Sequence, residues 1–388
     1  MTLRLPRRPF ARRPPLPAFS GKLHDARTAT VIGRLLGAAI AVCFVTGLVS
    51  HVLQQPPAWL MDGLPARPAW GYRVSQGLHV ASGIASVPLL LAKLWAVYPR
   101  LFVRPVVRSV RHALERLSVA VLVSAAVFEL FSGLLNIAQW YPWPFSFVPV
   151  HYAVAWLLAG ALLLHLAVKA PEIAAHWRSR SPGTLALPEE DAPDRRSLLA
   201  AVGAAVGAVT VVTVGQSVTP LGRVDLLAPR HPGHAPQGLP VNRTAAAAGI
   251  RPRAEVRENW RLTVSGPLPY ALTLGELRAL EQTTVTLPLA CVEGWSRSAE
   301  WTGVRVRDLL DRTGAPPTAR IRVTSMERRG AYRVMEMGRT YARDPLTLLA
   351  LRLGGEELSL DHGYPARIIA PNRPGVLQTK WVTRLEVL

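Results

Sequence analysis

Long apolar runs occupy the first half of the chain, and short alternating runs occupy its last third. A helix needs about 20 apolar residues to cross the hydrocarbon core of a bilayer. Four stretches have that length: Val31–Val52, Tyr72–Tyr98, Ala113–Ile137 and Val150–Lys169. A fifth, Ser197–Val218, is rich in Ala, Val and Gly. The pattern predicts an all-α transmembrane bundle of four helices and a fifth helix that serves as an anchor.

From about Asn242 the pattern changes to short runs typical of β-strands separated by turns. Strands are expected at Trp260–Val264, Thr284–Leu287, Arg320–Val323 and Ala366–Ile369. Helices are expected at Thr273–Glu281, Val306–Thr313 and Leu346–Leu353, the first with the capping-box spacing of Thr273 and Glu276. Strands and helices are mixed without the regular alternation of a nucleotide-binding sheet, so we expect an α+β domain.

These changes of pattern divide the chain into six segments. We expect a cytoplasmic basic tail at 1–29, a four-helix membrane domain at 30–175, a cytoplasmic loop at 176–196, a fifth helix at 197–218, a linker at 219–241 and the α+β domain at 242–388.

The 388 residues carry a formal net charge of +20 and have a mean hydropathy of +0.20. The tail, the loop after the second apolar stretch and the segment before the fifth are basic, whereas Asn136–Pro149 has no charged residue. The positive-inside rule then places the N terminus in the cytoplasm and the C-terminal domain outside, on the cell membrane of a bacterium. No base-reading motif is present, so nucleic acid is not an expected partner.

Two arginines, Arg195 and Arg196, directly precede the fifth apolar stretch. The segment Asp194–Leu199 resembles the twin-arginine export signal, which addresses proteins that cross the membrane already folded. A domain that receives its cofactor in the cytoplasm has to be exported folded. The fifth helix would then remain as an uncleaved anchor.

The first four apolar stretches contain an internal repeat. Thr46–Leu48, late in the first stretch, corresponds to Ser132–Leu134, late in the third. His79, early in the second stretch, corresponds to His151, early in the fourth. Imidazoles inside a bilayer are costly and mark functional sites. The alternative is that they are hydrogen-bonded structural residues. Glu129 fits either a quinone or proton site or a polar seam between helices.

Two neutral imidazoles on facing helices can bind a haem iron from both sides. His151 and His165 lie about 21 Å apart on one helix face, since fourteen residues make nearly four turns. This spacing resembles the fourth helix of the di-haem b-type cytochrome subunits of membrane formate dehydrogenases and hydrogenases. The resemblance implies that His79 and His151 bind one haem b near the outer face. A second haem would use His165, but Lys93 stands at the repeat position opposite it.

Only two cysteines are present, Cys43 in an apolar stretch and Cys291 in the polar C-terminal region, so no disulfide between them is expected. Cys291 follows the apolar run Val285–Ala290 and precedes Gly294. A thiolate at the end of a strand, before a tight turn, is well placed to reach a soft metal. We expect the nearby arginines to favour its ionised form.

The sequence around and after Cys291 resembles the molybdopterin domain of the sulfite oxidase family. The similarity is greatest to the branch that contains the periplasmic methionine sulfoxide reductase catalytic subunit, and it spans roughly residues 242–388. The matching blocks are Cys-Val-Glu-Gly-Trp-Ser at 291–296, Trp-Thr-Gly-Val at 301–304, Asp-Leu-Leu at 308–310, Leu-Leu-Ala at 348–350, Gly-Gly-Glu at 354–356, Asp-His-Gly-Tyr-Pro-Ala-Arg at 361–367 and Lys-Trp-Val at 380–382.

The resemblance implies a role for each matching residue. Cys291 would supply the protein thiolate to molybdenum, and Tyr332 and Tyr341 are candidates for the substrate side. The anionic phosphate of the pterin would be bound by cationic and polar groups. These are His362, Arg367 and Lys380, with the backbone amides of Gln378 and Thr379, and upstream Asn242 and Arg243.

Together these features predict a molybdenum-dependent oxidoreductase that passes electrons between the quinone pool, a membrane haem and an external molybdenum site. Reduction of an S-oxide or N-oxide is the expected reaction. The alternative is oxidation of sulfite or a similar small substrate, which the Glu-Gly-Trp-Ser turn disfavours because the animal and plant enzymes carry a Gly-Asn-Arg type turn there. A non-catalytic binding module and an ion transporter are further alternatives.

Overall fold

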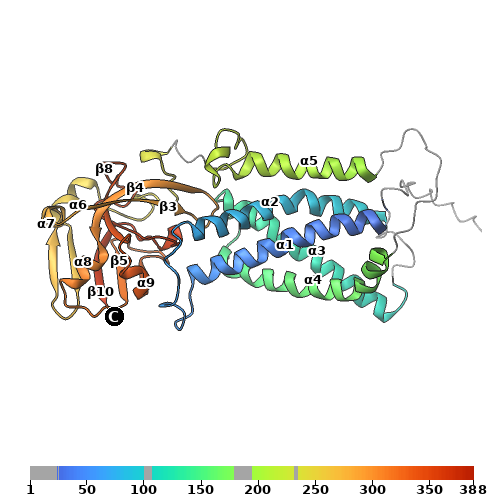
Figure 1. Cartoon of the computed structure of the whole chain (residues 1–388), viewed down its shortest axis with the longest axis horizontal. Coiled ribbons are helices and arrows are strands. Elements are labelled where there is room, and N and C mark those ends of the chain that lie inside the picture. Colours follow the sequence, from blue (N-terminus) through green and yellow to red (C-terminus); the bar gives the residue numbers. More distant parts are fainter. Residues whose placement is uncertain (1–23, 25, 100–106, 179–194, 231–234) are drawn as a thin grey trace, which may run out of the picture.

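The computed structural model describes residues 24, 26–99, 107–178, 195–230 and 235–388. The chain folds into an elongated molecule, with long helices at one end and a mixed domain of strands and short helices at the other (Figure 1). Most of the basic tail expected at 1–29 and of the loop expected at 176–196 lies outside the described residues.

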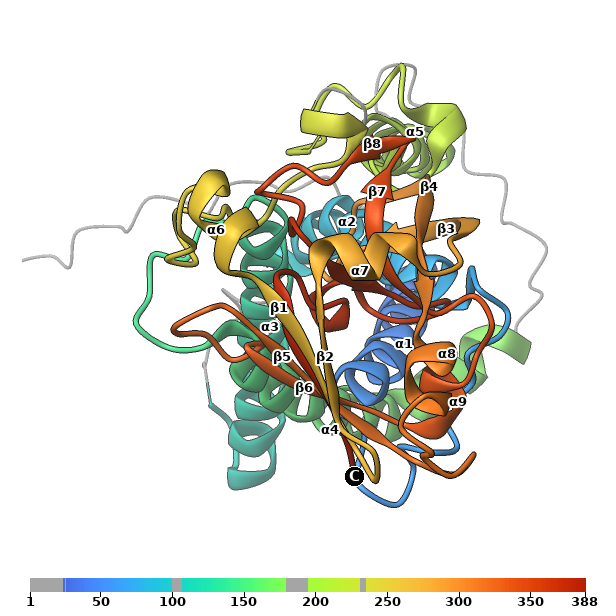
Figure 2. The ribbon, with the colours of Figure 1, turned by 90° about the vertical axis from the view of Figure 1, so that its left-hand side faces the viewer.

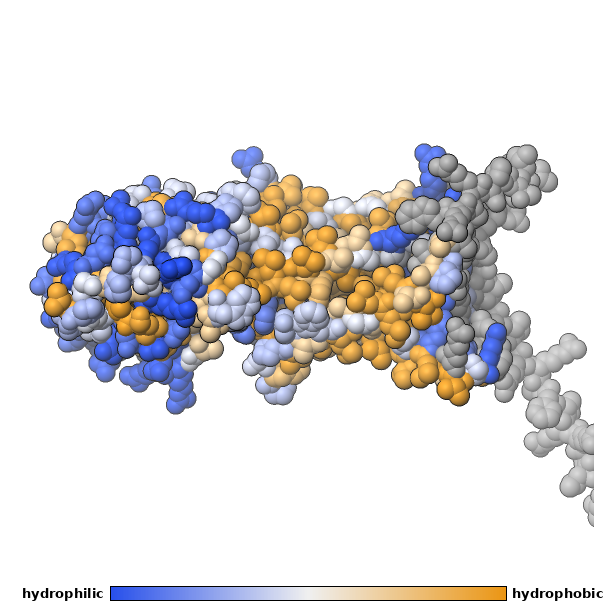
Figure 3. Space-filling model, turned by 60° about the horizontal axis from the view of Figure 1, so that its bottom comes forward, coloured by the Kyte–Doolittle hydropathy of each residue, from blue (hydrophilic) through white to orange (hydrophobic). Residues whose placement is uncertain are grey.

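Within the described residues, five helices are long and apolar enough to cross a membrane, as predicted. They are α1 (Ala26–Gln54), α2 (Gly71–Val97), α3 (Val110–Ile137), α4 (Phe147–Arg178) and α5 (Arg195–Val214). α1 packs along α2 and α3 along α4, whereas the two hairpins contact each other much less. α5 lies against α2 and apart from the other helices (Figures 1 and 2). Figure 3 shows apolar side chains along one face of the helical end, on surface that the protein itself leaves uncovered.

The fifth helix ends four residues earlier than predicted, at Val214 rather than Val218. The chain folds back tightly at Gly215, where a Cβ would lie 2.6 Å from the carbonyl oxygen of Leu221. The amide of Leu227 then donates to the carbonyl of Val212 at 2.9 Å. The expected linker therefore begins with a compact turn packed on the end of α5.

The C-terminal domain contains two sheets, and its pairings are antiparallel except for β1 with β10. One sheet has the order β2-β1-β10-β5-β6. The other has the order β3-β4-β7-β8, with β9 also paired to β7. The strands are β1 (Arg261–Ser265), β2 (Tyr270–Thr273), β3 (Thr283–Ala290), β4 (Ser296–Arg305), β5 (Ile321–Ser325), β6 (Val334–Met337), β7 (Leu348–Leu353), β8 (Glu356–Glu357), β9 (Arg367–Ile369) and β10 (Val382–Val387).

Short helices connect these strands: α6 (Arg253–Asn259), α7 (Leu274–Ala279), α8 (Val306–Asp311) and α9 (Arg339–Ala342). The capping box predicted for α7 is present in both directions between Thr273 and Glu276. The helix predicted at Leu346–Leu353 is wrong, because this segment is strand β7. It is buried between β4 and β9, and a short apolar run in such a place lacks the polar positions that distinguish a strand from a helix.

The loop between α1 and α2 holds the C-terminal domain against the helices. Arg67 donates to both oxygens of Asp344, at 3.0 and 3.1 Å, and Asp62 pairs with Arg320 at 2.5 Å. Asn372 accepts from the amide of Tyr72 at 2.6 Å and donates to the carbonyl of Pro65, also at 2.6 Å.

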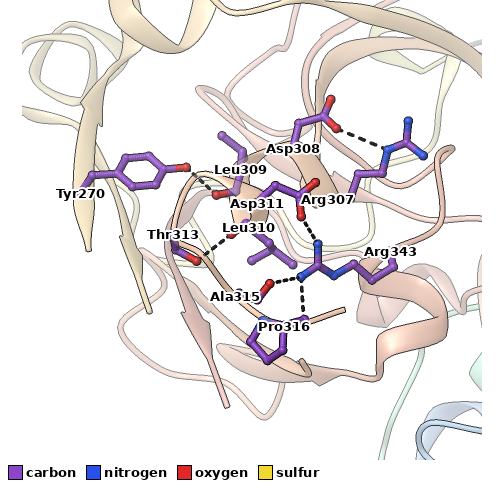
Figure 4. Close-up of polar contacts among 10 residues, drawn as sticks. All are labelled: Tyr270, Arg307, Asp308, Leu309, Leu310, Asp311, Thr313, Ala315, Pro316 and Arg343. Carbon is purple, nitrogen blue, oxygen red and sulfur yellow. Dashed lines mark hydrogen bonds and ion pairs between the residues drawn. The ribbon is translucent and has the colours of Figure 1, made fainter. Parts of the chain in front are cut away.

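The residue next to Asp344 fixes the same region from inside the domain. Arg343 donates to the carbonyls of Ala315 and Pro316, at 2.9 and 2.8 Å, and pairs with Asp311 at the end of α8 (Figure 4). The contacts between the α1–α2 loop and the C-terminal domain, called the clamp below, are thereby joined to the core of the domain.

Candidate active site

Cys291 lies at the end of β3, in a tight turn that buries its thiol. Its carbonyl accepts from the amide of Gly294 at 3.1 Å, and its amide donates to the carbonyl of Trp295 at 2.9 Å. Gly294 has a φ of +90°, a conformation that favours glycine. Only 3% of Cys291 is exposed.

Asn242 is the polar partner of this thiol. Its Nδ2 lies 2.7 Å from Cys291 Sγ, while its Oδ1 accepts from Trp295 Nε1 at 3.1 Å. Because the Trp295 contact fixes the amide orientation, Asn242 presents a donor to the sulfur. Such an arrangement suits a thiolate that binds a soft metal.

The expectation that arginines favour the thiolate is wrong for the metal-free chain. Burial raises the pKa of the Cys291 thiol, and the carboxylate of Glu293 raises it further. The thiol is therefore protonated at neutral pH until a metal binds, since a coordinating thiol is deprotonated outright. Burial also raises the pKa of Glu293 to about 7.

A group of buried cations is linked to Cys291 through Asn242, which contacts the thiol, and the adjacent Arg243, which contacts Lys380. Arg367, on β9, is 3% exposed and donates to the carbonyls of His362 and Gln378, at 3.1 and 3.3 Å. Its guanidinium lies over the ring of Trp301 at 5.1 Å. Burial lowers the pKa of Arg367 to about 9, which shows how unfavourable this charge is without a counter-ion.

Lys380 joins this group to the loop segment that contains Asn242. Its Nζ donates to the carbonyls of Arg243 and Asp361, at 2.5 and 2.8 Å. Burial and, to a smaller extent, the charge of Arg367 lower the pKa of Lys380 to about 7. Asn242 and Arg243 therefore connect the thiol to the cations. The sequence resemblance implied that all of these residues bind the same cofactor.

His362 is neutral in this environment, because burial lowers its pKa to about 4. Its Nε2 lies 2.7 Å from the carbonyl of Pro236, so in the neutral ring the proton is on Nε2. To donate a hydrogen bond to an anion from Nδ1, the ring would have to carry protons on both nitrogens. The backbone amide of Gln378, expected on the cofactor, donates to the carbonyl of Gly375 at 3.1 Å.

Several buried polar atoms near the cations have no hydrogen-bond partner within the described residues. They are Nε of Arg367, Oε1 of Gln378 and Oγ1 of Thr379. Arg243 is less buried and pairs with Glu327 at 3.4 Å. A polar anion would satisfy the free atoms and offset the buried positive charge. The residues present thus fit an anionic, hydrogen-bonding group such as a pterin phosphate.

The two candidate tyrosines lie in different places. Tyr332, on the β5–β6 hairpin, is 37% exposed. Burial raises its pKa, and the charge of a Cys291 thiolate raises it further. Tyr341 is 2% exposed, and its hydroxyl donates to the carbonyls of Pro65 and Asn372, at 3.3 and 3.4 Å. Tyr341 is therefore a structural residue of the clamp rather than a substrate contact.

The histidine pair predicted from the repeat comes together in the helical bundle. The rings of His79 and His151 have centroids 6.3 Å apart and planes at 81°. His79 Nδ1 donates to the carbonyl of Cys43 at 2.8 Å. His151 Nδ1 lies 3.1 Å from a carboxylate oxygen of Glu129 and 3.2 Å from the hydroxyl of Ser132. Each Nδ1 is thus occupied, which leaves each Nε2 for a metal.

The repeat also places a glycine beside each histidine. A Cβ at Gly47 would lie 2.9 Å from Cε1 of His79, and one at Gly133 would lie 3.8 Å from Cε1 of His151. At the inner position, Lys93 Nζ donates to the carbonyl of Ala29 at 2.6 Å. The lysine is thereby tied to α1.

The helices touch the turn that bears Cys291 through residues that sequence reasoning missed. Gln76 donates to the carbonyl of Val292 at 2.8 Å, and Gln139 donates to the carboxylate of Glu293. The carbonyl of Gln216 accepts from the amide of Ser296 at 2.8 Å. Polar residues at helix ends are usually solvated, so their sequence carries no signal of such contacts.

Gly294 also packs directly on α2. A Cβ at Gly294 would lie 2.6 Å from Cγ2 of Val80, which follows His79 in the sequence. The turn that bears the thiol therefore packs directly on the helix turn that bears the histidine.

Comparison with known proteins agrees with this geometry. Residues 248–388 match the family model of the oxidoreductase molybdopterin binding domain. The C-terminal domain is a molybdopterin-binding oxidoreductase domain. The predicted sulfite oxidase family resemblance is confirmed for this domain, while the helical half is not matched by that family.

Among curated proteins, the chain is similar to a provisionally named protein-methionine-sulfoxide reductase subunit, YedZ1, of Azospira oryzae. The two are 34% identical over 139 residues, which are 34% of this chain and 52% of that protein. The catalytic subunit MsrP of the protein-methionine-sulfoxide reductase of Xanthomonas campestris is 30% identical over 143 residues, covering 32% of this chain and 44% of that protein. The chain thus spans about half the length of these relatives.

Among solved structures, the sulfane dehydrogenase SoxCD of Paracoccus pantotrophus is 25% identical, with a TM-score of 0.31. The match covers 34% of this chain and 38% of that one.

Proposed function

We propose that the chain is a membrane-bound, molybdopterin-dependent oxidoreductase that takes electrons from quinol through a haem b and reduces an S-oxide or N-oxide. The observation that carries the proposal is the packing of Gly294 on Val80. It brings the thiol turn of a molybdopterin-binding domain against the helix that presents His79. A direct contact of this kind suits electron transfer within one chain.

The molybdopterin half of the proposal rests on the fit of the cation group. When bound, the cofactor supplies two-electron oxygen-atom chemistry. Cys291 would hold the metal, and Asn242 would fix the sulfur. Arg367, Lys380 and a protonated His362 would neutralise the phosphate. Because thiol and anion-binding residues are both kept, a degenerate binding module is disfavoured.

The haem half rests on the spacing of the histidines. An imidazole nitrogen binds a metal at about 2.0–2.1 Å and lies about 1.1 Å from its ring centre, so two imidazoles that would hold one metal ion between them would have ring centres roughly 6.3 Å apart. The centroids of His79 and His151 are 6.3 Å apart. Glu129 would act on the metal through His151, by accepting its Nδ1 proton. We propose one haem, since Lys93 stands where an inner ligand would be needed.

The proposed topology has the N terminus in the cytoplasm and the C-terminal domain outside the cell membrane. The five apolar helices and the basic loops support it. Export of the folded domain would use the twin-arginine segment at 194–199, of which Arg195 and Arg196 open α5.

Reduction of a sulfoxide breaks its S–O bond, and two electrons and two protons convert the oxygen to water. Quinol supplies both electrons and is oxidised to quinone, releasing two protons. Tyr332 is exposed, and the charge of a Cys291 thiolate raises its pKa, so we propose it as the residue that contacts the oxygen of the substrate.

The test is purification of the full chain in detergent, followed by measurement of molybdenum, the haem Soret band and viologen-linked reduction of dimethyl sulfoxide. We expect both cofactors, and we expect Cys291→Ser to reduce turnover by more than the roughly 100-fold that loss of an outer-shell partner costs. Cys43→Ser, at the other cysteine, should keep its molybdenum. A Cys291→Ser protein with normal molybdenum and normal turnover would contradict the proposal.

A further inference from the structure

A small cavity, with a volume of about 80 Å³, lies where the helical half meets the C-terminal domain. One side is lined by Leu53, Gln54 and Leu64, from the end of α1 and the loop after it. The other side is lined by Met335 of β6 and by Arg373, in the segment after β9. The cavity therefore exists only when the two halves are docked. It has room for a small ion and its water, since a single water needs about 10–15 Å³.

Arg373 brings a buried positive charge to this cavity, since only 6% of the residue is exposed. Its Nε donates to the carbonyl of Leu377 at 3.2 Å, and its Nη2 donates to the carbonyl of Glu336 at 2.8 Å. The guanidinium also lies over the ring of Tyr341 at 5.2 Å. Nη1 has no hydrogen-bond partner within the described residues and remains accessible to a small ligand. Arg373 can therefore donate into the cavity.

The groups around this guanidinium do not neutralise its charge. Carbonyl oxygens and an aromatic ring carry only partial charges, and the carboxylate of Glu336 pairs with Arg322 at 3.0 Å. Within the described residues no carboxylate pairs with Arg373. Burial lowers the pKa of Arg373 to about 10, which leaves the group charged at neutral pH. A buried charge is unfavourable without a counter-ion, so an anion in the cavity would stabilise it.

Hydrogen bonds connect the helical wall of the cavity to the turn that bears Cys291. Gln54 Nε2 donates to the hydroxyl of Ser50 at 2.9 Å, and that hydroxyl donates to Gln76 Oε1 at 2.8 Å. Gln76 then donates to the carbonyl of Val292, the residue after Cys291, at 2.8 Å. An ion that holds the cavity together would therefore also hold the helices against this turn.

We propose that this cavity binds a small monovalent inorganic anion, such as chloride, on Nη1 of Arg373, and that the bound ion stabilises the docking of the two halves. Among the lining residues that the structure describes, Arg373 is the only cation, so a single negative charge matches it. The small volume admits a halide ion and excludes bulky anions. Because the lining comes from both halves, the ion binds the docked molecule and not the separated halves, and it therefore stabilises the docked state.

The experiment is thermal unfolding of the full chain in detergent while chloride replaces gluconate. The exchange keeps the ionic strength constant, so screening of surface charges does not change. Gluconate, a six-carbon anion, is too bulky for the cavity. We expect Tm to rise by roughly 3–5 °C for each tenfold increase in chloride above its Kd. Binding is followed directly by broadening of the chlorine NMR signal on addition of the protein.

Arg373→Met removes the donor and its charge and should abolish both the chloride-dependent rise in Tm and the broadening. Arg322→Met is the matched control, because it removes a nearby cation that does not line the cavity, and it should keep both effects. A wild-type Tm that does not respond to chloride would overturn the inference, as would a rise that Arg373→Met retains. Should Arg373→Met not fold, anomalous diffraction from bromide-soaked crystals of the wild-type protein decides, by the presence or absence of an ion beside Arg373.

Discussion

The contact between Gly294 and Val80 joins the two halves of the molecule, and a single methyl group at Gly294 tests it. Gly294→Ala introduces two separable penalties. A φ of +90° is unfavourable for alanine, by about 1–2 kcal/mol. The new Cβ would also lie 2.6 Å from Val80 Cγ2, and overpacking of this kind costs about 1–3 kcal/mol. We expect a total loss of about 2–5 kcal/mol in the free energy of unfolding.

Val80→Ala removes the atom that the new methyl meets, so it should relieve the second penalty and leave the first. A double-mutant cycle isolates that relief, with an expected coupling energy of about 1–3 kcal/mol. Gly354→Ala is the matched control, because Gly354 has a φ of +60° and nothing within 4 Å of its Cβ position. Val80→Ala should not reduce the loss of stability that Gly354→Ala causes.

The assay is thermal unfolding of the full chain in detergent, followed by tryptophan fluorescence. A loss of 1 kcal/mol corresponds to about 2–4 °C in Tm for a domain of 150–250 residues. The reasoning fails if Val80→Ala rescues Gly294→Ala no better than it rescues Gly354→Ala. In that case the domain does not dock on α2 as described, and the proposed electron path loses its support.

Two further predictions concern the cofactors. His79→Ala and His151→Ala should each abolish the Soret band of the purified protein, whereas His112→Ala should keep it; a normal Soret band in both of the first two variants would exclude the haem site. Lys380 should make cofactor binding pH-dependent: its pKa of about 7 lies below the value of about 10.4 in an unfolded chain, so the cofactor-free protein gains stability as pH rises from 7 toward 10. Molybdopterin binding needs the charged form and should weaken above pH 7, by up to about tenfold per pH unit, when uptake by cofactor-free protein is measured from pH 6 to 8. Lys380→Met should make this slope shallower and leave the part that comes from protonation of His362, and an unchanged slope in that variant would contradict the assignment.

The sequence predicted the elements whose physical signal is local. Apolar runs of about 20 residues located all five long helices, and Thr273 with Glu276 located the start of α7. The repeat correctly paired His79 with His151, because equivalent positions in two similar hairpins lie at similar depth. The ordered blocks after Cys291 identified the family of the C-terminal domain.

The features that could not be predicted depend on contacts between distant residues. Nothing near Gln139 indicates that it will donate to Glu293, 154 residues away. The state of the Cys291 thiol was misjudged because nearby arginines in the sequence do not neutralise the cost of burial. The segment Leu346–Leu353 was misjudged because a run buried on both faces has no visible period.

The loop between α1 and α2, with Asp62 and Arg67 gripping Arg320 and Asp344, has a consequence for the kinetics of assembly. Two separate subunits in a membrane must find each other by diffusion, and their encounter depends on how much of each is made. Here docking is intramolecular, at an effective concentration that short linkers raise to the millimolar range. Dilution of the protein in the membrane should therefore leave turnover per molecule constant, and equal numbers of the two halves are guaranteed by translation itself.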